Sequence, residues 1–245
     1  MMKIKSYQKE SDYSYTTGVF ETIELLKAKP DLVSRIYLAS NSYQNKGVAI
    51  ITKIASQHDI EVVESDKTIN RLVKKGNCLA LAVFEKYQDE LNQANHVVLV
   101  NPSDMGNLGT IIRTMSGFSY RDLAIVGSGA DTFDPKVLRA SMGAIFGLRI
   151  KYYDSFEQYR GEFPDNQVFS LMLKGAKNLH QVTPPQQFHS LVFGNESSGL
   201  PDVYLEYGQS IFINHTQAID SLNLAMAVGI TLFHFSKVNF MDFVV

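Results

Sequence analysis

The 245-residue chain has a single cysteine and no tryptophan. With Cys78 alone it can form neither an internal disulfide nor a zinc site built from several cysteines, a pattern typical of reducing compartments. The most apolar stretch, residues 222–235, contains Asn223 and His234 and is too short to span a bilayer. The N-terminal residues have no apolar signal core. We therefore expect a cytoplasmic protein without membrane association.

Several patterns that carry known chemistry are also missing. There is no His-x-x-x-His pair or carboxylate cluster at metal-ligand spacing, no Gly-x-Ser-x-Gly elbow and no Walker loop. We expect no metal site. Gly127 and Gly129 resemble the opening of a dinucleotide-binding loop, but its third glycine is absent. The hypothesis of a nicotinamide dehydrogenase therefore rests on these two glycines alone.

Charge is nearly balanced, with a net value of −2. Residues 1–95 have 13 basic against 12 acidic side chains, and residues 96–245 have 10 against 13. No general basic field indicates nucleic-acid binding, but the N-terminal part is the better binder of a polyanion.

Two runs of alternating helices and strands are separated by a polar linker, residues 85–95. We expect one domain over residues 1–90, whose first 17 residues form a loose lead-in, and a second domain over residues 96–245. In the second, apolar strands alternate with helices, which predicts an α/β fold with a mostly parallel sheet. The expected strands are residues 97–100, 123–126, 148–152, 168–173, 191–193 and 211–213. The expected helices are residues 110–117, 135–144, 156–163, 201–207 and 221–235.

Three polar loops follow buried strands of the second domain. They are residues 101–109, residues 194–199, and residues 214–217 with 220–223. Each loop alone is explained by a turn and a helix cap; Asp220 or Ser221 would cap the last helix, and Asn107 suits a turn. Because parallel strands end at the same edge of a sheet, the three loops together favour a site.

These loops resemble the three ordered motifs of the SpoU/TrmH family of RNA ribose 2′-O-methyltransferases, part of the SPOUT superfamily. The matching segments are NPSDMGNLGTIIRT, LVFGNESSGL and IFINHTQAIDSLNLAMAVGI, within residues 97–235. Residues 1–90 are similar to the family's L30e-like RNA-binding domain in their opening GVFE and in the strand KGNCLALAVFE.

The resemblance implies a methyltransferase domain with a C-terminal trefoil knot, S-adenosylmethionine as cofactor, rRNA or tRNA as substrate, and a homodimer. It assigns catalytic positions in all three motifs, namely Asn107, Arg113, Glu196, Ser221 and Asn223. It places cofactor contacts mainly on the backbone of Gly194, Ile213 and Leu222.

Arg113 is the family's usual candidate for activating the ribose hydroxyl. A free arginine has a pKa near 13.8, so a neutral guanidinium at pH 7 costs roughly 9 kcal/mol. We therefore expect a charged Arg113 that binds the adjacent phosphate and stabilises the forming alkoxide. The alternative is a salt bridge to Glu196 without a catalytic part. Glu196 and Asn107 are expected to orient Arg113 or the ribose.

The third motif departs from the family pattern, because it reads Ile213-Asn214-His215-Thr216-Gln217 where Ile-Pro-Met-x-Gly is usual. His215 could contact the cofactor or be an ordinary loop residue. This departure motivates the alternative of a non-enzymatic RNA-binding protein that has lost its cofactor.

Overall fold

The computed structural model describes residues 4–73 and 77–236. The chain divides into two compact units, Met1–Tyr87 with Asp131–Gly147, and Gln88–Ala130 with Leu148–Val245. The sequence prediction placed a division near residue 90, but it assigned residues 131–147 to the second domain. In the structure this segment leaves the second unit and packs with the first.

The first unit contains a four-stranded mixed sheet in the order β1-β4-β2-β3. β4 is antiparallel to β1 and β2, and β2 is parallel to β3. The strands are β1 (Tyr13–Tyr15), β2 (Val33–Leu38), β3 (Val62–Glu64) and β4 (Ala80–Glu85). The helices are α1 (Val19–Ala28), η1 (Pro30–Leu32), α2 (Lys46–Gln57), α3 (Asp66–Leu72), α5 (Pro135–Ala140) and η2 (Ala144–Gly147).

Two features of this unit correct the sequence prediction. Tyr13–Tyr15 is a strand rather than part of a loose lead-in, because it pairs with β4 and buries the Tyr15 ring. The segment 131–147 joins this unit because Phe133 and Phe146 pack edge-on against Phe84, at ring-centroid distances of 5.9 and 5.4 Å. Aromatic burial of this kind depends on tertiary packing, which local sequence does not reveal.

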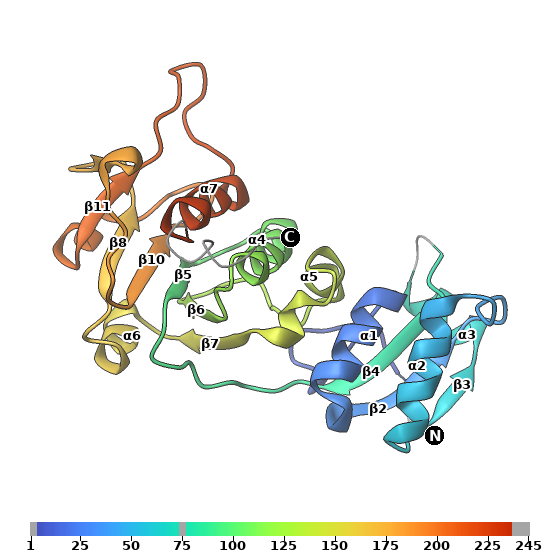
Figure 1. Ribbon diagram of the computed structural model, residues 1–245. Coiled ribbons are helices and arrows are strands. Elements are labelled where there is room, and N and C mark those ends of the chain that lie inside the picture. The colour runs from blue at the N-terminus through green and yellow to red at the C-terminus, as the bar shows by residue number, and fades with distance from the viewer. Residues whose placement is uncertain (1–3, 74–76, 237–245) are drawn as a thin grey trace, which may run out of the picture. The chain divides into compact units, whose positions relative to one another are not determined.

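The second unit contains a seven-stranded, all-parallel sheet in the order β7-β6-β5-β10-β8-β11-β9 (Figure 1). This confirms the predicted α/β fold. The strands are β5 (His96–Val100), β6 (Asp122–Val126), β7 (Arg149–Tyr153), β8 (Gln167–Leu171), β9 (Lys177–Asn178), β10 (His189–Phe193) and β11 (Gln209–Phe212). The helices are α4 (Met105–Gly117), α6 (Phe156–Glu162), η3 (Leu179–Gln181), η4 (Asp202–Glu206) and α7 (Leu224–Ser236).

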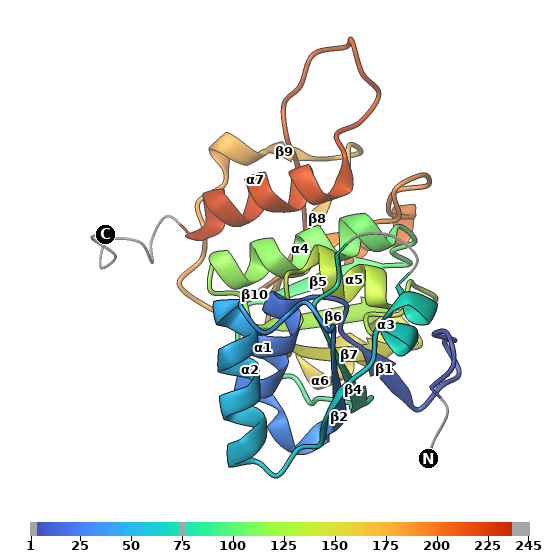
Figure 2. The same cartoon turned by 90° about the vertical axis from the view of Figure 1, so that its right-hand side faces the viewer.

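Both faces of this sheet are covered. Alternate residues of the central strands, such as Val98, Val126 and Val192, form one core cluster with Phe156 and Tyr159 of α6. Because strand side chains alternate between faces, the intervening residues point to the other side. The helices α4 and α7 lie side by side (Figures 1 and 2). The near-continuous apolar strands seen in the sequence follow from this two-sided burial.

The chain leaves β11 as a long loop and returns to α7 (Figure 1). The predicted helix over residues 221–235 begins later than expected, at Leu224, because the Asn223 side chain caps it. The predicted helix over residues 201–207 is a 3₁₀ segment. Within residues 4–73 and 77–236, no helix has the length and apolar character needed to cross a membrane.

Candidate active site

The loops after β5 and β10 start next to each other, because these strands pair in parallel with Phe193 opposite Leu99. The Asn195 side chain joins the two loops by donating to the carbonyl of Asn101 over 2.8 Å. Non-local register thus brings residues more than 90 positions apart into contact at the carboxyl edge of the sheet, as the sequence predicts.

The Glu196 carboxylate is the centre of this contact. It accepts hydrogen bonds from the Ser103 amide at 3.1 Å, the Ser103 hydroxyl at 2.9 Å and the Asp104 amide at 3.1 Å. The side-chain amides of Asn107 and Asn195 donate to it over 3.4 and 3.3 Å. Glu196 therefore fastens the loop that leads into α4.

The charge of Glu196 is stabilised by this arrangement. Its partial burial raises the pKa of the carboxyl, but hydrogen bonds from the backbone of Glu196, Ser103 and Asp104 outweigh burial and leave the pKa below its ordinary value. An ionised carboxylate with these partners is a poor proton acceptor. Its chemistry fits a positioning residue.

Asn107 connects this contact to the third motif. Its side-chain oxygen accepts from the Asn223 amide over 3.0 Å, and its backbone amide donates to Asp104, the N-cap of α4, over 2.6 Å. The Asn223 oxygen in turn accepts from the amides of Ala225 and Met226 at the start of α7. All three motifs therefore meet through Glu196, Asn107 and Asn223. We call these three residues, with Ser103, Asp104 and Asn195, the Glu196 cluster.

Arg113 stands apart from the Glu196 cluster. It lies on α4, and its exposed side chain forms no hydrogen bond or ion pair with any residue in the described part of the chain. The salt bridge to Glu196 that the sequence left open is not formed, because the carboxylate is occupied by other donors. A cation without a protein partner is suited to bind an external anion.

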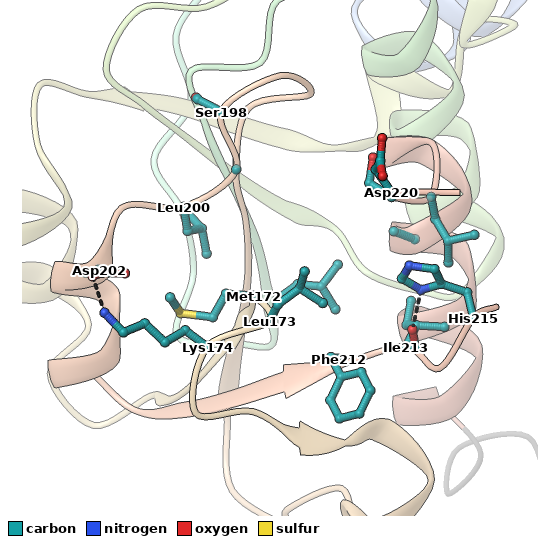
Figure 3. A pocket seen from close by; sticks show the side chains of 15 residues that line it. Met172, Leu173, Lys174, Ser198, Leu200, Asp202, Phe212, Ile213, His215 and Asp220 are labelled. Atoms are coloured by element: carbon teal, nitrogen blue, oxygen red, sulfur yellow. Dashed lines mark hydrogen bonds and ion pairs between the residues drawn. The ribbon is translucent and has the colours of Figure 1, made fainter. Parts of the chain in front are cut away.

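A cavity of about 330 Å³ lies beside the cluster, between the loops after β8, β10 and β11 (Figure 3). Leu171, Met172, Leu200 and Phe212 give it an apolar wall. At its edge, Lys174 forms an ion pair with Asp202, which Figure 3 shows as a dashed line. The remaining lining residues are Leu173, Ser198, Gly199, Ile213, His215, Asp220, Ser221, Leu222 and Ala227.

The three predicted cofactor residues have different places. Ile213 and Leu222 line the cavity, and Gly194 does not. Gly194 acts one layer behind: a Cβ there would lie 2.2 Å from the backbone carbon of Gly199 and 2.5 Å from the nitrogen of Leu200. Only a residue without a side chain lets the cavity wall at Gly199 and Leu200 approach so closely.

Two polar residues of the third motif also line the cavity. Ser221 is exposed and has no hydrogen-bond partner in the described chain. His215 Nδ1 lies 2.9 Å from the Ile213 carbonyl, as Figure 3 shows. Because a carbonyl only accepts, this nitrogen carries the proton, and Nε2 of a neutral ring is left as an acceptor. His215 is thus part of the cavity wall.

Gly127 and Gly129, the weak dinucleotide signal, have a structural explanation. Gly127 has φ of +76°, and a Cβ there would lie 2.4 Å from Oδ1 of Asn101. That oxygen accepts from the Ser128 amide over 2.9 Å. The glycine loop is therefore shaped to receive the Asn101 side chain, which argues against a dinucleotide cradle.

Sequence reasoning missed the contribution of β8. Met172, Leu173 and Lys174 follow this strand and line the cavity, yet the loop was not considered because it lacks polar motif residues. Applying the carboxyl-edge rule to every strand would have indicated it. Ser103 and Asn195 lay inside predicted loops, but their partners could not be assigned locally.

The second unit is an α/β domain that holds a cavity at the carboxyl edge of its sheet and, on α4, an arginine whose side chain has no partner in the described chain. Among the described residues, no group of His, Cys, Asp and Glu could hold a metal ion. The model of the SpoU rRNA Methylase family matches residues 94–233, more than half of the chain. The chain belongs to this family.

Similar proteins extend this result. The Bacillus subtilis 23S rRNA (guanosine(2553)-2′-O)-methyltransferase RlmP is 28% identical over 158 residues, which are 62% of each chain. The Aeromonas hydrophila tRNA (cytidine(34)-2′-O)-methyltransferase is 29% identical over 140 residues, 56% of this chain and 89% of that one. The AdoMet-bound rRNA methyltransferase from Sinorhizobium meliloti has a TM-score of 0.80 at 24% identity, covering 95% of this chain and 90% of that chain.

Proposed function

We propose that this chain is an enzyme that transfers the methyl group of S-adenosylmethionine to a ribose 2′-hydroxyl of structured rRNA or tRNA. The observation that carries the proposal is the meeting of three loops at one sheet edge: two of them line a cavity, and the third leads into α4, which carries Arg113 without a side-chain partner in the described chain. Membership of the SpoU family supports it. The named activities of RlmP and of the tRNA methyltransferase support the ribose hydroxyl as acceptor.

The cavity fits the cofactor chemically. Its apolar wall of Met172, Leu200 and Phe212 suits an adenine ring, and backbone and side-chain polar groups near Ile213, His215 and Ser221 suit the ribose and the methionine end. When bound, S-adenosylmethionine supplies an electrophilic methyl group on a positively charged sulfur. Gly194 shapes the cavity wall, because its missing side chain allows the backbone of Gly199 to approach.

Arg113 acts on the other reactant. The 2′-hydroxyl oxygen would form a bond to the methyl carbon while the carbon–sulfur bond breaks and the electron pair stays on sulfur, and the hydroxyl proton would pass to water. Negative charge develops on the oxygen as the proton leaves. A charged guanidinium next to it stabilises this charge and binds the adjacent phosphate. Glu196 and Asn107 are positioning residues, because they hold the start of α4 and thereby the place of Arg113. Ser221 lines the cavity on the α7 side, and Asn223 joins the start of α7 to Asn107.

The first unit supplies RNA docking in this proposal, as an L30e-like domain. Its α/β architecture with a mixed sheet is compatible with that class, and the structural likeness to the Sinorhizobium methyltransferase extends over 95% of the chain. The enzyme works in the cytoplasm, where structured rRNA and tRNA are found.

The active form is a homodimer. Met226, Ile230 and Phe233 lie at positions i, i+4 and i+7 of α7 and are 61%, 37% and 57% exposed. An apolar helix face of this kind is a typical protein–protein interface. A second copy of the chain covers this face of α7.

The chain between β11 and α7 forms the trefoil knot. The chain runs from β11 to α7, and α7 packs against α4, the helix that follows β5. Because β10 and β8 lie between β5 and β11 in the sheet, this return supports that path.

Purified protein with methyl-labelled S-adenosylmethionine and unmodified rRNA or tRNA tests the proposal. Nuclease digestion followed by mass spectrometry is expected to yield a 2′-O-methylated nucleotide. Calorimetry with S-adenosylmethionine alone distinguishes the alternative of a non-enzymatic RNA-binding protein. Absence of cofactor binding together with RNA binding would favour that alternative and reject the proposed reaction.

A further inference from the structure

A second cavity of about 530 Å³ lies in the second unit, at the carboxyl ends of β5, β6 and β7. Val100, Val126 and Asp154 mark those ends. The cavity shares Ser198 and Gly199 with the proposed cofactor cavity, so the loop after β10 contributes to both. Parallel α/β sheets bind ligands in crevices at this edge, and the proposed reaction uses only the first of the two cavities.

The floor of this second cavity is aromatic. The rings of Phe156, Tyr204 and Tyr207 line it, with centroids 4.9 Å apart for Phe156 and Tyr204 and 4.8 Å apart for Phe156 and Tyr207. Phe156 and Tyr204 belong to the buried core, so the floor is rigid. Aromatic rings attract cations through the negative charge of their faces.

The charged groups at this cavity are carboxylates. Asp154 and Glu157 line it, and no lysine, arginine or histidine is among the described residues that do. The Asp154 carboxylate has no partner in residues 4–73 and 77–236. Glu157 accepts from the Tyr207 hydroxyl, and this hydrogen bond holds the pKa of its carboxyl below the ordinary value. Two negative charges therefore face the cavity without a compensating positive charge.

Tyr204 adds an independent observation. Its side chain is only 4% exposed, and its hydroxyl has no hydrogen-bond partner in the described chain. The hydroxyl oxygen nevertheless keeps some access to solvent. Tyr204 is one of the residues that line the cavity. A buried hydroxyl left without a protein partner is a group that a ligand can satisfy.

We propose that this second cavity binds an organic cation, an ammonium or guanidinium group, held by the Asp154 carboxylate and the Tyr204 hydroxyl over the aromatic floor. Such groups carry several donors and a positive charge, which match two carboxylates, a free hydroxyl and ring faces. An RNA segment is disfavoured, because its phosphates would face carboxylates without any basic residue to offset the repulsion. The cation comes from a free polyamine or from a lysine or arginine side chain of a peptide.

Calorimetry on the full-length protein tests this binding with three probes: spermidine, N-acetylargininamide and its neutral counterpart N-acetylglutaminamide. We expect saturable binding of a cationic probe and none of the neutral one. Preference for spermidine indicates a polyamine site, and preference for the arginine derivative indicates a peptide side chain. Asp154→Asn is expected to weaken the bound cation about tenfold, since it removes a charged acceptor worth about 1.4 kcal/mol.

Matched variants keep the test specific. Tyr204→Phe keeps the ring and removes only the unpartnered hydroxyl, so it is expected to weaken binding several-fold without unfolding the protein. Asp165→Asn removes an exposed carboxylate of the same unit outside the cavity and is expected to leave binding unchanged. Equal binding by wild type, Asp154→Asn and Tyr204→Phe would overturn the proposal. Guanosine is added as a further control ligand; its binding in place of both cations would also overturn the proposal and indicate a nucleobase pocket.

Failure of this proposal is distinguishable from failure of the proposed methyl transfer. Asp154 and Tyr204 do not line the cofactor cavity, so affinity for S-adenosylmethionine is expected to stay within twofold in both variants. Loss of cofactor binding in these variants, with cation binding unchanged, would contradict the separation of the two cavities.

Discussion

Around Glu196, five hydrogen bonds converge on one carboxylate, whereas across residues 214–222 the described chain has a single side-chain hydrogen bond, from His215 to Ile213. The first region is assembled in the protein alone. The second is exposed and offers polar groups that a ligand can satisfy. From this contrast we expect the Glu196 cluster to position α4 and the loop before α7 to bind the cofactor.

The largest effect is expected at Arg113. This residue lies on α4, which the Glu196 cluster holds in place, but its side chain has no partner in the described chain. Arg113→Ala is expected to lower methyl transfer by about 10²–10³-fold, the usual cost of removing a group that stabilises developing charge. Its unfolding free energy is expected to change by less than about 0.5 kcal/mol, because the side chain is exposed. Filter assays and chemical denaturation measure the two quantities.

Arg113→Lys is the matched control for this prediction. It keeps the charge but loses the planar fork, so partial activity is expected. Undiminished transfer by Arg113→Ala would remove Arg113 from the chemistry.

Gly194 lies in the loop after β10, which carries Glu196 and also lines the cavity next to residues 214–222. Its missing side chain lets this loop close the cavity. In Gly194→Ala the new methyl group would meet the backbone of Gly199 at 2.2 Å, which neither chain segment can relieve without moving. We expect a loss of about 1–3 kcal/mol in stability and at least about a tenfold weaker affinity for S-adenosylmethionine. Denaturation and calorimetry check these values.

Gly161→Ala serves as the control, since nothing lies within 4 Å of a Cβ there. It is expected to leave both quantities unchanged or to stabilise α6 slightly. Normal cofactor binding by Gly194→Ala would show that the close approach is not needed.

Glu196→Gln tests whether the cluster is structural. The substitution keeps the size of the side chain but replaces an acceptor oxygen by an NH₂ group that faces backbone donors. The expected loss of stability is about 1–3 kcal/mol. Activity falls with it, because α4 loses its anchor. A variant that loses activity at unchanged stability would give Glu196 a direct catalytic part instead.

The stability difference between wild type and Glu196→Gln is expected to depend on pH. The folded-state pKa of Glu196 is lower than the ordinary value of 4.5, so the unfolded chain binds more protons near that pH. The stability contributed by the carboxylate is therefore complete above pH 4.5 and is lost as the pH falls through the folded-state value. The difference between wild type and Glu196→Gln is expected to shrink in acid and to be constant from pH 6 to 8.

Ser221 represents the adaptable region and should give the smallest effect. Ser221→Ala removes an exposed hydroxyl that has no partner in the described chain, so stability is expected to stay within about 0.5 kcal/mol. Affinity for S-adenosylmethionine is expected to fall roughly threefold to tenfold, as for the loss of one hydrogen bond. A large loss of stability would contradict the view that this loop is ordered by its ligand.

The parallel α/β fold and the edge of the sheet at which the candidate site lies could be predicted from the sequence. Apolar strands followed by polar loops are a local signal, and parallel strands necessarily bring their carboxyl ends together. The motif residues Asn107, Glu196 and Asn223 could therefore be expected to meet. The resemblance to the SpoU family identified in the sequence agrees with the family match over residues 94–233.

The partners of the polar side chains could not be predicted, because they depend on the tertiary structure. Whether Glu196 would pair with Arg113 or with the backbone of Ser103 and Asp104 depends on the register of β5 and β10 and on hydrogen-bond directions that no local pattern encodes. The same holds for the segment 131–147, which joins the first unit through Phe133 and Phe146. Side-chain type is a property of the sequence, but the partner of a buried or half-buried polar group is set by the surrounding fold.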